Sequence, residues 1–356
     1  MSHLFTPITL RDVTVRNRAW VAPMCQYSAV DGVPNDWHLV HLGSFARGGA
    51  GLVFTEATAV TPEGRISPED TGIWNDDQQA AWARIVDFVH AQGAAAGIQL
   101  AHAGRKASTY SGFTGDHGAV ADADGGWRPV GPSAEPFPGL RHDPEPLTRD
   151  GITRLVTAFG DAAERSVTAG FDVLEVHAAH GYLLHEFLSP LSNQRDDEYG
   201  GTFDNRVRLL LEVVREVRSR VRSSVPVVVR LSATDWVEGG WSDDDTVRLA
   251  VLLREEGVDL VDTSTGGNVR ADIPVGPGYQ VPFARRIRTE AGVASGAVGL
   301  ITGPKQAEEI LAEGSADVVL LGRELLRDPH WPLRAAYELG ETDPGLWPGQ
   351  YERAAR

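Results

Sequence analysis

The sequence predicts a (β/α)8 barrel, a closed ring of parallel strands joined by helices. Short β-branched apolar runs alternate with longer segments of helical periodicity, and eight such runs follow one another along the chain. A doubly wound sheet would need a topological switch and usually has fewer strands. The chain of 356 residues is long for one core, but α/β barrels commonly reach this size as one domain. We therefore expect a single domain over residues 1–356.

The expected elements follow in chain order. The strand candidates are Ala19–Met24, Leu52–Ala59, Ala95–Leu100, Val173–His177, Val225–Leu231, Leu260–Thr263, Val293–Val298 and Val318–Leu321. The helix candidates are Asp76–Gln92, Thr148–Ala169, Asp204–Val221, Ser242–Glu256, Pro304–Glu313 and Pro329–Leu339. Thr148 and Ser242 are expected to cap their helices, with carboxylates in the first turn opposing the helix dipole. Left-handed glycines are expected after four helices, at Gly93, Gly170, Gly257 and Gly314.

The stretch from Ser111 to Pro146 is rich in glycine, proline and aspartate, and it is longer than most connections in compact domains. It follows the third strand candidate, so in a barrel it would lie on the catalytic face. We interpret residues 111–146 as a lid-like insertion rather than a domain linker.

Composition limits the partners and the compartment. The formal net charge of -16 disfavours nucleic acids and anionic membranes, because binding to either depends on surplus Lys and Arg. Cys25 is the only cysteine, which excludes intrachain disulfides and metal or iron–sulfur sites built on several cysteines. The first residues lack a signal-peptide pattern, and no run of about 18 apolar residues occurs. We expect a cytoplasmic protein that does not span a membrane.

His177, His180 and Tyr182 follow the fourth strand candidate, where polar residues of a barrel are often catalytic. If a helical turn begins there, both imidazoles point the same way and can hold one carbonyl or nitro oxygen, as an oxyanion hole does. The Tyr182 phenol would be a proton donor at neutral pH. The spacing alone also allows structural histidines or a zinc site, although the sequence offers no obvious third ligand.

Two glycine-bounded turns, Gly296–Ile301 and Leu321–Glu324, follow the last two strand candidates. Barrels often bind phosphate there, because glycines let backbone N–H groups approach an anion, to which Arg323 would add charge. Ordinary turn formation is the alternative. Arg230 and Gln99 are expected to point into the same opening of the barrel, at the carboxyl ends of the strands. A buried arginine there needs an anionic partner. No Gly-x-Gly-x-x-Gly follows a strand, so nothing indicates a Rossmann site.

The sequence resembles the Old Yellow Enzyme family of FMN-dependent ene-reductases, and specifically its thermophilic-like, cysteine-bearing subclass. The resemblance covers almost the whole chain. It is carried by Leu4-Phe5-Thr6-Pro7, Ala22-Pro23-Met24-Cys25-Gln26-Tyr27, the segments from Gln99 to Lys106, from His177 to Tyr182 and from Asn193 to Gly201, Gly322-Arg323, and Gln350-Tyr351-Glu352-Arg353. One departure is Ala22, where the family frequently has serine.

The resemblance implies a non-covalently bound FMN. The residues that it places around the flavin are Pro23, Met24, Cys25, Ala57, Gln99, Arg230, Gly299, Gly322 and Arg323. Gln99 would bond the pyrimidine edge, Arg230 would stabilise the anionic reduced flavin, and Cys25 would tune its potential without acting as a nucleophile. His177 and His180 would bind the activating oxygen of the substrate, and Tyr27 would assist from the opposite wall. No metal is expected.

The resemblance also implies a ping-pong reaction. NADPH or NADH would reduce FMN and leave, and an electrophilic alkene, an α,β-unsaturated carbonyl or nitro compound, would then take its place. Hydride would pass from flavin N5 to the β-carbon while Tyr182 protonates the α-carbon. The tail 340–356 would reach a neighbouring subunit of a homodimer or homotetramer, with Arg353 entering the active site of that subunit.

Three other functions can be compared with this one. A metal-dependent hydrolase would use His177 and His180 as ligands, and a flavin carrier or sensor would bind the flavin without catalysis. A dienoyl-CoA reductase of the larger related type needs a cysteine-ligated cluster, which the single cysteine excludes.

Overall fold

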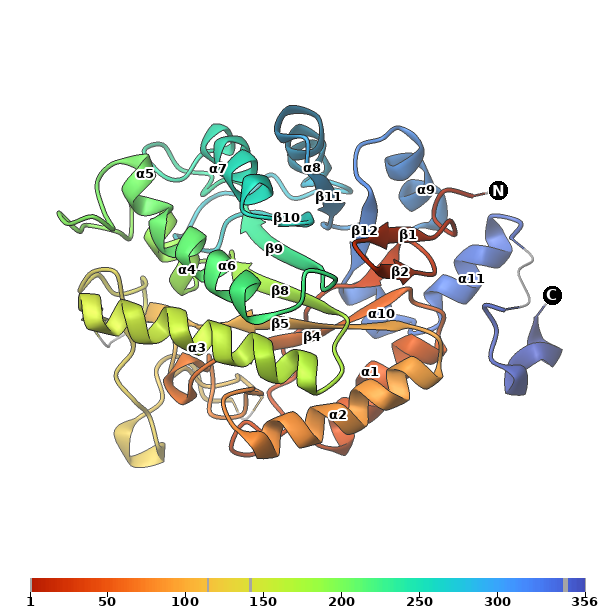
Figure 1. The fold of residues 1–356 in the computed structure, drawn as a ribbon, viewed down its shortest axis with the longest axis horizontal. Helices are drawn as coiled ribbons and strands as arrows, with labels where there is room; N and C mark the ends of the chain where they lie inside the picture. The colour runs from red at the N-terminus through yellow and green to blue at the C-terminus, as the bar shows by residue number, and fades with distance from the viewer. Residues whose placement is uncertain (1, 114, 141–142, 342–344, 356) are drawn as a thin grey trace.

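The structure is a computed structural model that describes residues 2–113, 115–140, 143–341 and 345–355. Its centre is a closed barrel in which all strand pairs are parallel and the strands follow chain order (Figure 1). The strands are β3 (Ala19–Val21), β4 (Leu52–Ala59), β5 (Ala95–Ala101), β8 (Val173–Ala178), β9 (Val227–Ser232), β10 (Leu260–Ser264), β11 (Ala294–Ala297) and β12 (Val318–Leu321). The predicted (β/α)8 barrel is confirmed, and each predicted run overlaps one strand.

Helices cover the outside of the barrel, as Figure 1 shows for α2, α3 and α6. The longer ones are α1 (Asp36–Arg47), α2 (Asp76–Ala91), α3 (Arg149–Thr168), α6 (Arg208–Arg220), α7 (Asp243–Glu255), α9 (Pro304–Ala312) and α11 (Trp331–Glu338). Shorter ones are α4 (Leu183–Leu188), α5 (Phe203–Arg206), α8 (Val281–Arg286) and α10 (Arg323–Arg327). The predicted helix Asp204–Val221 is divided at Val207 into α5 and α6. Helices α1, α4, α8 and α10 were not predicted from the sequence.

The predicted helix ends are confirmed. The Thr148 side chain accepts a hydrogen bond from the N–H of Gly151, and Ser242 and Asp245 form a reciprocal capping box at the start of α7. All four predicted left-handed glycines have positive φ, from 67° at Gly314 to 98° at Gly170. Because these caps stop each helix at a set residue, they fix where the next strand begins.

An N-terminal hairpin closes one end of the barrel. It consists of β1 (Ile8–Leu10) and β2 (Val13–Val15), which pair in antiparallel fashion. Its buried Leu10 and Val15 pack in one core cluster with the first residues of barrel strands, among them Leu52 and Val173. The end that remains for a ligand is therefore the one at which the strands finish.

The predicted segment 111–146, of which residues 114 and 141–142 lie outside the described residues, falls between β5 and α3 and includes the short strands β6 (Val130–Gly131) and β7 (Glu145–Pro146). Two of its aromatic side chains lie close to residues that follow barrel strands. Phe113 meets Tyr27 edge to face at 5.6 Å between ring centroids, and the Nζ of Lys106 lies 4.4 Å from the ring centroid of Phe137. These contacts place the segment at the carboxyl ends of the strands.

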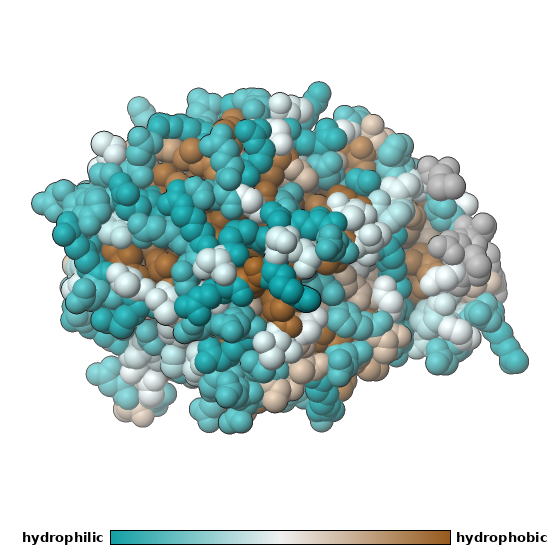
Figure 2. Space-filling model, in the orientation of Figure 1, coloured by the Kyte–Doolittle hydropathy of each residue, from teal (hydrophilic) through white to brown (hydrophobic). Residues whose placement is uncertain are grey.

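No helix in the described part of the chain is both long and apolar enough to cross a membrane. On the face drawn in Figure 2, hydrophilic residues cover most of the surface and hydrophobic ones form small, separate areas. This face therefore offers no extended apolar patch.

Loss of the α7 capping box is expected to destabilise the protein. Ser242→Ala should lower the free energy of unfolding by about 1 kcal/mol, because the N–H of Asp245 loses its acceptor. Urea denaturation measures this. The control is Ser219→Ala, which removes an exposed hydroxyl within α6 and should change stability by less than about 0.5 kcal/mol. Equal effects of the two variants would contradict the capping role.

Candidate active site

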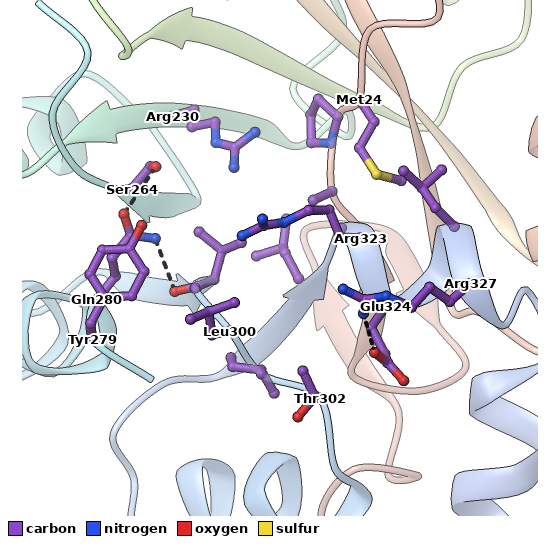
Figure 3. A pocket seen from close by; sticks show the side chains of 18 residues that line it. Met24, Arg230, Ser264, Tyr279, Gln280, Leu300, Thr302, Arg323, Glu324 and Arg327 are labelled. Carbon is purple, nitrogen blue, oxygen red and sulfur yellow. Dashed lines mark hydrogen bonds and ion pairs between the residues drawn. The ribbon is translucent and has the colours of Figure 1, made fainter. Parts of the chain in front are cut away.

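A cavity of about 290 Å³ opens at the carboxyl ends of the strands (Figure 3). The chain after β3 contributes Pro23 and Met24, and β9 contributes Arg230. The turns after β11 and β12 contribute residues 299–302 and 322–324. The two glycine-bounded turns of the sequence analysis therefore line one cavity.

The turn side of this cavity is suited to an anion. The backbone N–H groups of Gly299, Leu300, Gly322 and Arg323 donate no hydrogen bond to another described residue. The Arg323 side chain extends across the cavity in Figure 3 and forms no ion pair with a described carboxylate. Unpaired N–H groups beside a free guanidinium fit a phosphate group.

Not every residue predicted to surround a flavin lines this cavity. Six of them do: Pro23, Met24, Arg230, Gly299, Gly322 and Arg323. Cys25 and Ala57 instead pack in a neighbouring cluster with Tyr27 and Tyr182. Gln99 lies in the barrel interior, where its side-chain amide donates to the carboxylate of Glu175 at 2.6 Å.

His177 and His180 meet as predicted, but a helical turn does not bring them together. His177 lies in β8, whereas His180 has a φ of 59°, and α4 begins only at Leu183. The left-handed residue reverses the chain, so that the two ring centroids are 5.2 Å apart. Tyr182 joins them, with its ring centroid also 5.2 Å from that of His177.

Buried polar contacts hold this turn in place. The N–H of Gly181 donates to Nδ1 of His185 at 2.9 Å. The proton of that imidazole is consequently on Nε2, which lies 3.1 Å from the Asp235 carboxylate. The Nζ of Lys106 donates to the carbonyls of His180 and Gly267, both at 2.8 Å. Backbone and side chains thus fix the conformation in which His180 is presented.

The two histidines differ in their partners. Nε2 of His180 lies 2.7 Å from Oγ of Ser264, which leaves Nδ1 for a ligand. His177 forms no hydrogen bond to a described residue through either ring nitrogen. Burial and the adjacent Arg230 lower the pKa of both imidazoles well below the ordinary value. Both rings are therefore neutral near pH 7, and each can donate one N–H to a ligand oxygen.

The phenols of this region are protonated. Burial, together with Cys25 and Tyr27, raises the pKa of Tyr182 well above its ordinary value, and burial likewise raises that of Tyr27. Burial also raises the pKa of the Cys25 thiol, with further contributions from Asp70 and Glu56. Cys25 is thus a neutral thiol at pH 7, and the non-nucleophilic role predicted for it stays a prediction.

Sequence reasoning missed three polar residues of the site. Ser264 ends β10 and contacts His180, and Gln280, which precedes α8, donates to the Val298 carbonyl at 3.1 Å. Lys106 lies with its Nζ 5.2 Å from the ring centroid of Tyr182. Ser264 and Lys106 both follow or end a barrel strand, and that position was the available signal.

The geometry separates the histidine pair from the carboxylates that a metal would need. Within the described residues, the one trio of potential ligands with suitable spacing is Cys25, Glu56 and Asp70, whose ligand atoms lie within 4.8 Å of one another. His177 and His180 are not in this group.

The exposed Arg353 lies in the turn Gly349–Ala354, whose Tyr351 contacts Arg47 and His330 of the same chain.

Comparison with known proteins gives consistent matches. The model of the NADH:flavin oxidoreductase / NADH oxidase family matches residues 3–342. An NADPH dehydrogenase of Listeria innocua is 49% identical over 356 residues, which cover 99% of each chain. The structure of morphinone reductase in complex with tetrahydroNAD is 29% identical, with a TM-score of 0.79 over 98% of this chain and 95% of that one. A 2-naphthoyl-CoA reductase solved with 2-naphthoyl-CoA is 26% identical, with a TM-score of 0.85, and the chain spans 52% of its length.

The turn at Gly181 should not tolerate a side chain. Gly181→Ala would place a methyl group 2.3 Å from the Gly267 carbonyl oxygen at a φ of 69°. The control is Gly201→Ala, which has a φ of 78° but open space around the added methyl group. Urea denaturation should show a loss of about 1 kcal/mol for Gly201→Ala, from backbone strain alone, and a clearly larger loss for Gly181→Ala. Similar losses would contradict the close packing of this turn.

Proposed function

Because the chain belongs to the NADH:flavin oxidoreductase / NADH oxidase family, the Old Yellow Enzyme family that its motifs resemble, we propose that it reduces activated C=C bonds. It is an oxidoreductase of this type, with FMN as cofactor and a nicotinamide nucleotide as electron donor. The proposed substrates are α,β-unsaturated carbonyl and nitro compounds. The proposed order is ping-pong, with donor and alkene using one pocket in turn.

The observation that carries the proposal is the meeting of His177, His180 and Tyr182. Two neutral imidazoles and one protonated phenol lie together, and both ring separations from His177 are 5.2 Å. Reduction of an enone or nitroalkene needs hydrogen-bond donors for the oxygen that gains charge and an acid for the α-carbon. This set provides both kinds of group.

The proposed FMN site is the cavity lined by both turns. Arg323 and the unpaired N–H groups after β11 and β12 would hold the phosphate, and Arg230 would face the flavin ring. Pro23 and Met24 would pack against it, with Cys25, Ala57 and Gln99 nearby. When bound, FMN supplies hydride transfer, which no side chain of this site can perform.

The histidine pair would bind and polarise the substrate. Nδ1 of His180 and a nitrogen of His177 remain without described partners, so each can donate to the carbonyl or nitro oxygen. Their lowered pKa keeps them neutral, so binding requires no loss of a proton near neutral pH. Tyr27 would contact the substrate from the other side. Tyr182 would give its proton to the α-carbon.

Two further proposals concern access to the site. The segment 111–146 would act as a lid, supported by the contacts of Phe113 with Tyr27 and of Phe137 with Lys106. The tail 340–356, of which residues 342–344 and 356 lie outside the described residues, would reach a second subunit of a homodimer or homotetramer, where Arg353 would enter the partner's substrate pocket. The exposure of Arg353 leaves it available for this contact.

The double variant His177→Ala/His180→Ala tests the proposed oxygen site. Anaerobic stopped-flow absorbance follows the two half-reactions separately, flavin reduction by NADPH and reoxidation by cyclohexenone. Reoxidation should slow by about 10² or more, as is typical for removal of oxyanion donors. Flavin reduction should change much less. Equal slowing of both half-reactions would contradict the role, and wild-type flavin that an enone cannot reoxidise would favour a flavin carrier.

Tyr182→Phe tests the proposed proton donor while keeping the aromatic ring. Reoxidation by an enone should slow by about 10²- to 10⁴-fold, because a general acid is lost. Binding of a phenolic ligand, measured from the change in flavin absorbance, should remain within a few-fold of wild type. The matched control is Tyr110→Phe, because Tyr110 directly precedes the insertion and its phenol donates to Asp124 at 2.7 Å. Unchanged reoxidation in Tyr182→Phe would assign the proton to another group.

A further inference from the structure

The barrel interior holds a cluster of two carboxylates and one guanidinium. Glu175 on β8, Arg230 on β9 and Asp262 on β10 stand on adjacent strands, and Gln99 on β5 completes the group. Asp262 is paired with Arg230 across the strand register, at 2.9 Å between Oδ2 and Nε. Both acids are fully buried, and Arg230 is 6% exposed.

This cluster contains one positive charge for two acids. Oε2 of Glu175 and Oδ1 of Asp262 accept no hydrogen bond from a described residue, and Oδ2 of Asp262 has its ion pair with Arg230. The charged or titratable groups that face Glu175 are Asp262 and Arg230, and Gln99 donates to its Oε1. A second bare carboxylate at this depth would be costly, because one guanidinium cannot neutralise both acids.

The proton balance therefore favours one protonated acid. Burial and the nearby Asp262 raise the pKa of Glu175 to about 8, and burial raises that of Asp262, which Arg230 opposes. Near pH 7 Glu175 is mostly neutral, while Asp262 is paired with Arg230. Above pH 8 Glu175 ionises and the cluster gains a negative charge.

Arg230 connects the cluster to the site, because the same side chain lines the cavity. We propose that Glu175, beside the Arg230–Asp262 ion pair, takes up or releases a proton and so adjusts the charge around Arg230 when the bound flavin is reduced. This inference rests on the proposed position of FMN beside Arg230. Glu175 acts through Arg230 and does not touch the reacting atoms, so it is a positioning residue.

The coupled step balances in charge and atoms. Above pH 8, a bound FMN that accepts a hydride (two electrons and one proton) from NADPH would gain one negative charge, and NADP⁺ would leave. That charge makes ionised Glu175 take one proton from solvent. Below pH 8, Glu175 is already protonated and takes up none. The flavin potential should therefore involve one proton per two electrons at low pH and two above pH 8.

Spectroelectrochemistry of the FMN-loaded protein from pH 6.5 to 9.5 tests this inference. The midpoint potential of the wild type should fall by about 30 mV per pH unit at first and about twice as steeply above pH 8, since a tenfold change in equilibrium is 29.6 mV for two electrons. In Glu175→Gln the steeper part should be absent. In Asp262→Asn the bend should move to lower pH, because a charge that raises the pKa of Glu175 is removed.

The control is Glu186→Gln, which removes another buried acid whose pKa is raised to about 8 but which lies beside Arg105 and Lys106. It should keep the wild-type bend. A wild-type curve without a bend, or a bend that persists in Glu175→Gln, would overturn the inference. If Glu175→Gln does not fold, the wild-type curve and Asp262→Asn decide. No alkene is present in this measurement, so a protein that shows the bend yet leaves enones unreduced refutes the proposed function alone.

Discussion

The ion pair between buried Arg230 and Asp262 is the interaction on which the rest of the site depends. Arg230 stands between two neighbours in the sheet register, His177 on one side and Asp262 on the other. The Arg230 side chain lines the ligand cavity. Its positive charge contributes to the lowered pKa of both site histidines and opposes the raised pKa of Asp262. A neutral residue in place of Arg230 would leave the buried acids Glu175 and Asp262 without a positive charge beside them. It would also change the electrostatic potential at the carboxyl ends of the strands.

The site divides into two regions of different charge. The turns after β11 and β12 offer Arg323 and unpaired N–H groups, which suit a permanent anion. The turn after β8 offers neutral imidazoles and protonated phenols, which suit a group that becomes negative only during reaction. Because the chain has a net charge of -16, most of its surface should repel an anion. The turns with Arg323 are therefore the place where an anion is expected to bind.

Much of this arrangement could be predicted from the sequence, because strand alternation and helix caps are local signals. The eight strands, the caps at Thr148 and Ser242 and the meeting of His177 with His180 are confirmed. The helical turn considered for bringing the histidines together does not occur, and nothing local in the sequence distinguishes His180 as a left-handed residue. Helix α1 was missed because two of its large apolar side chains, Trp37 and Val40, face outward. Gln99 and Glu175 meet only through strand register, which no single segment encodes. The site roles carried over by resemblance stay proposals.

The hairpin β1–β2 covers the end of the barrel at which the strands begin. Because Leu10 and Val15 pack against the strand starts, a bound molecule enters and leaves at the same rim. Trp20 and Phe54 are buried in the same cluster, so the inside of the barrel at this end is packed core rather than a passage. One end of the barrel therefore serves stability, and the opposite end is left for the ligand cavity.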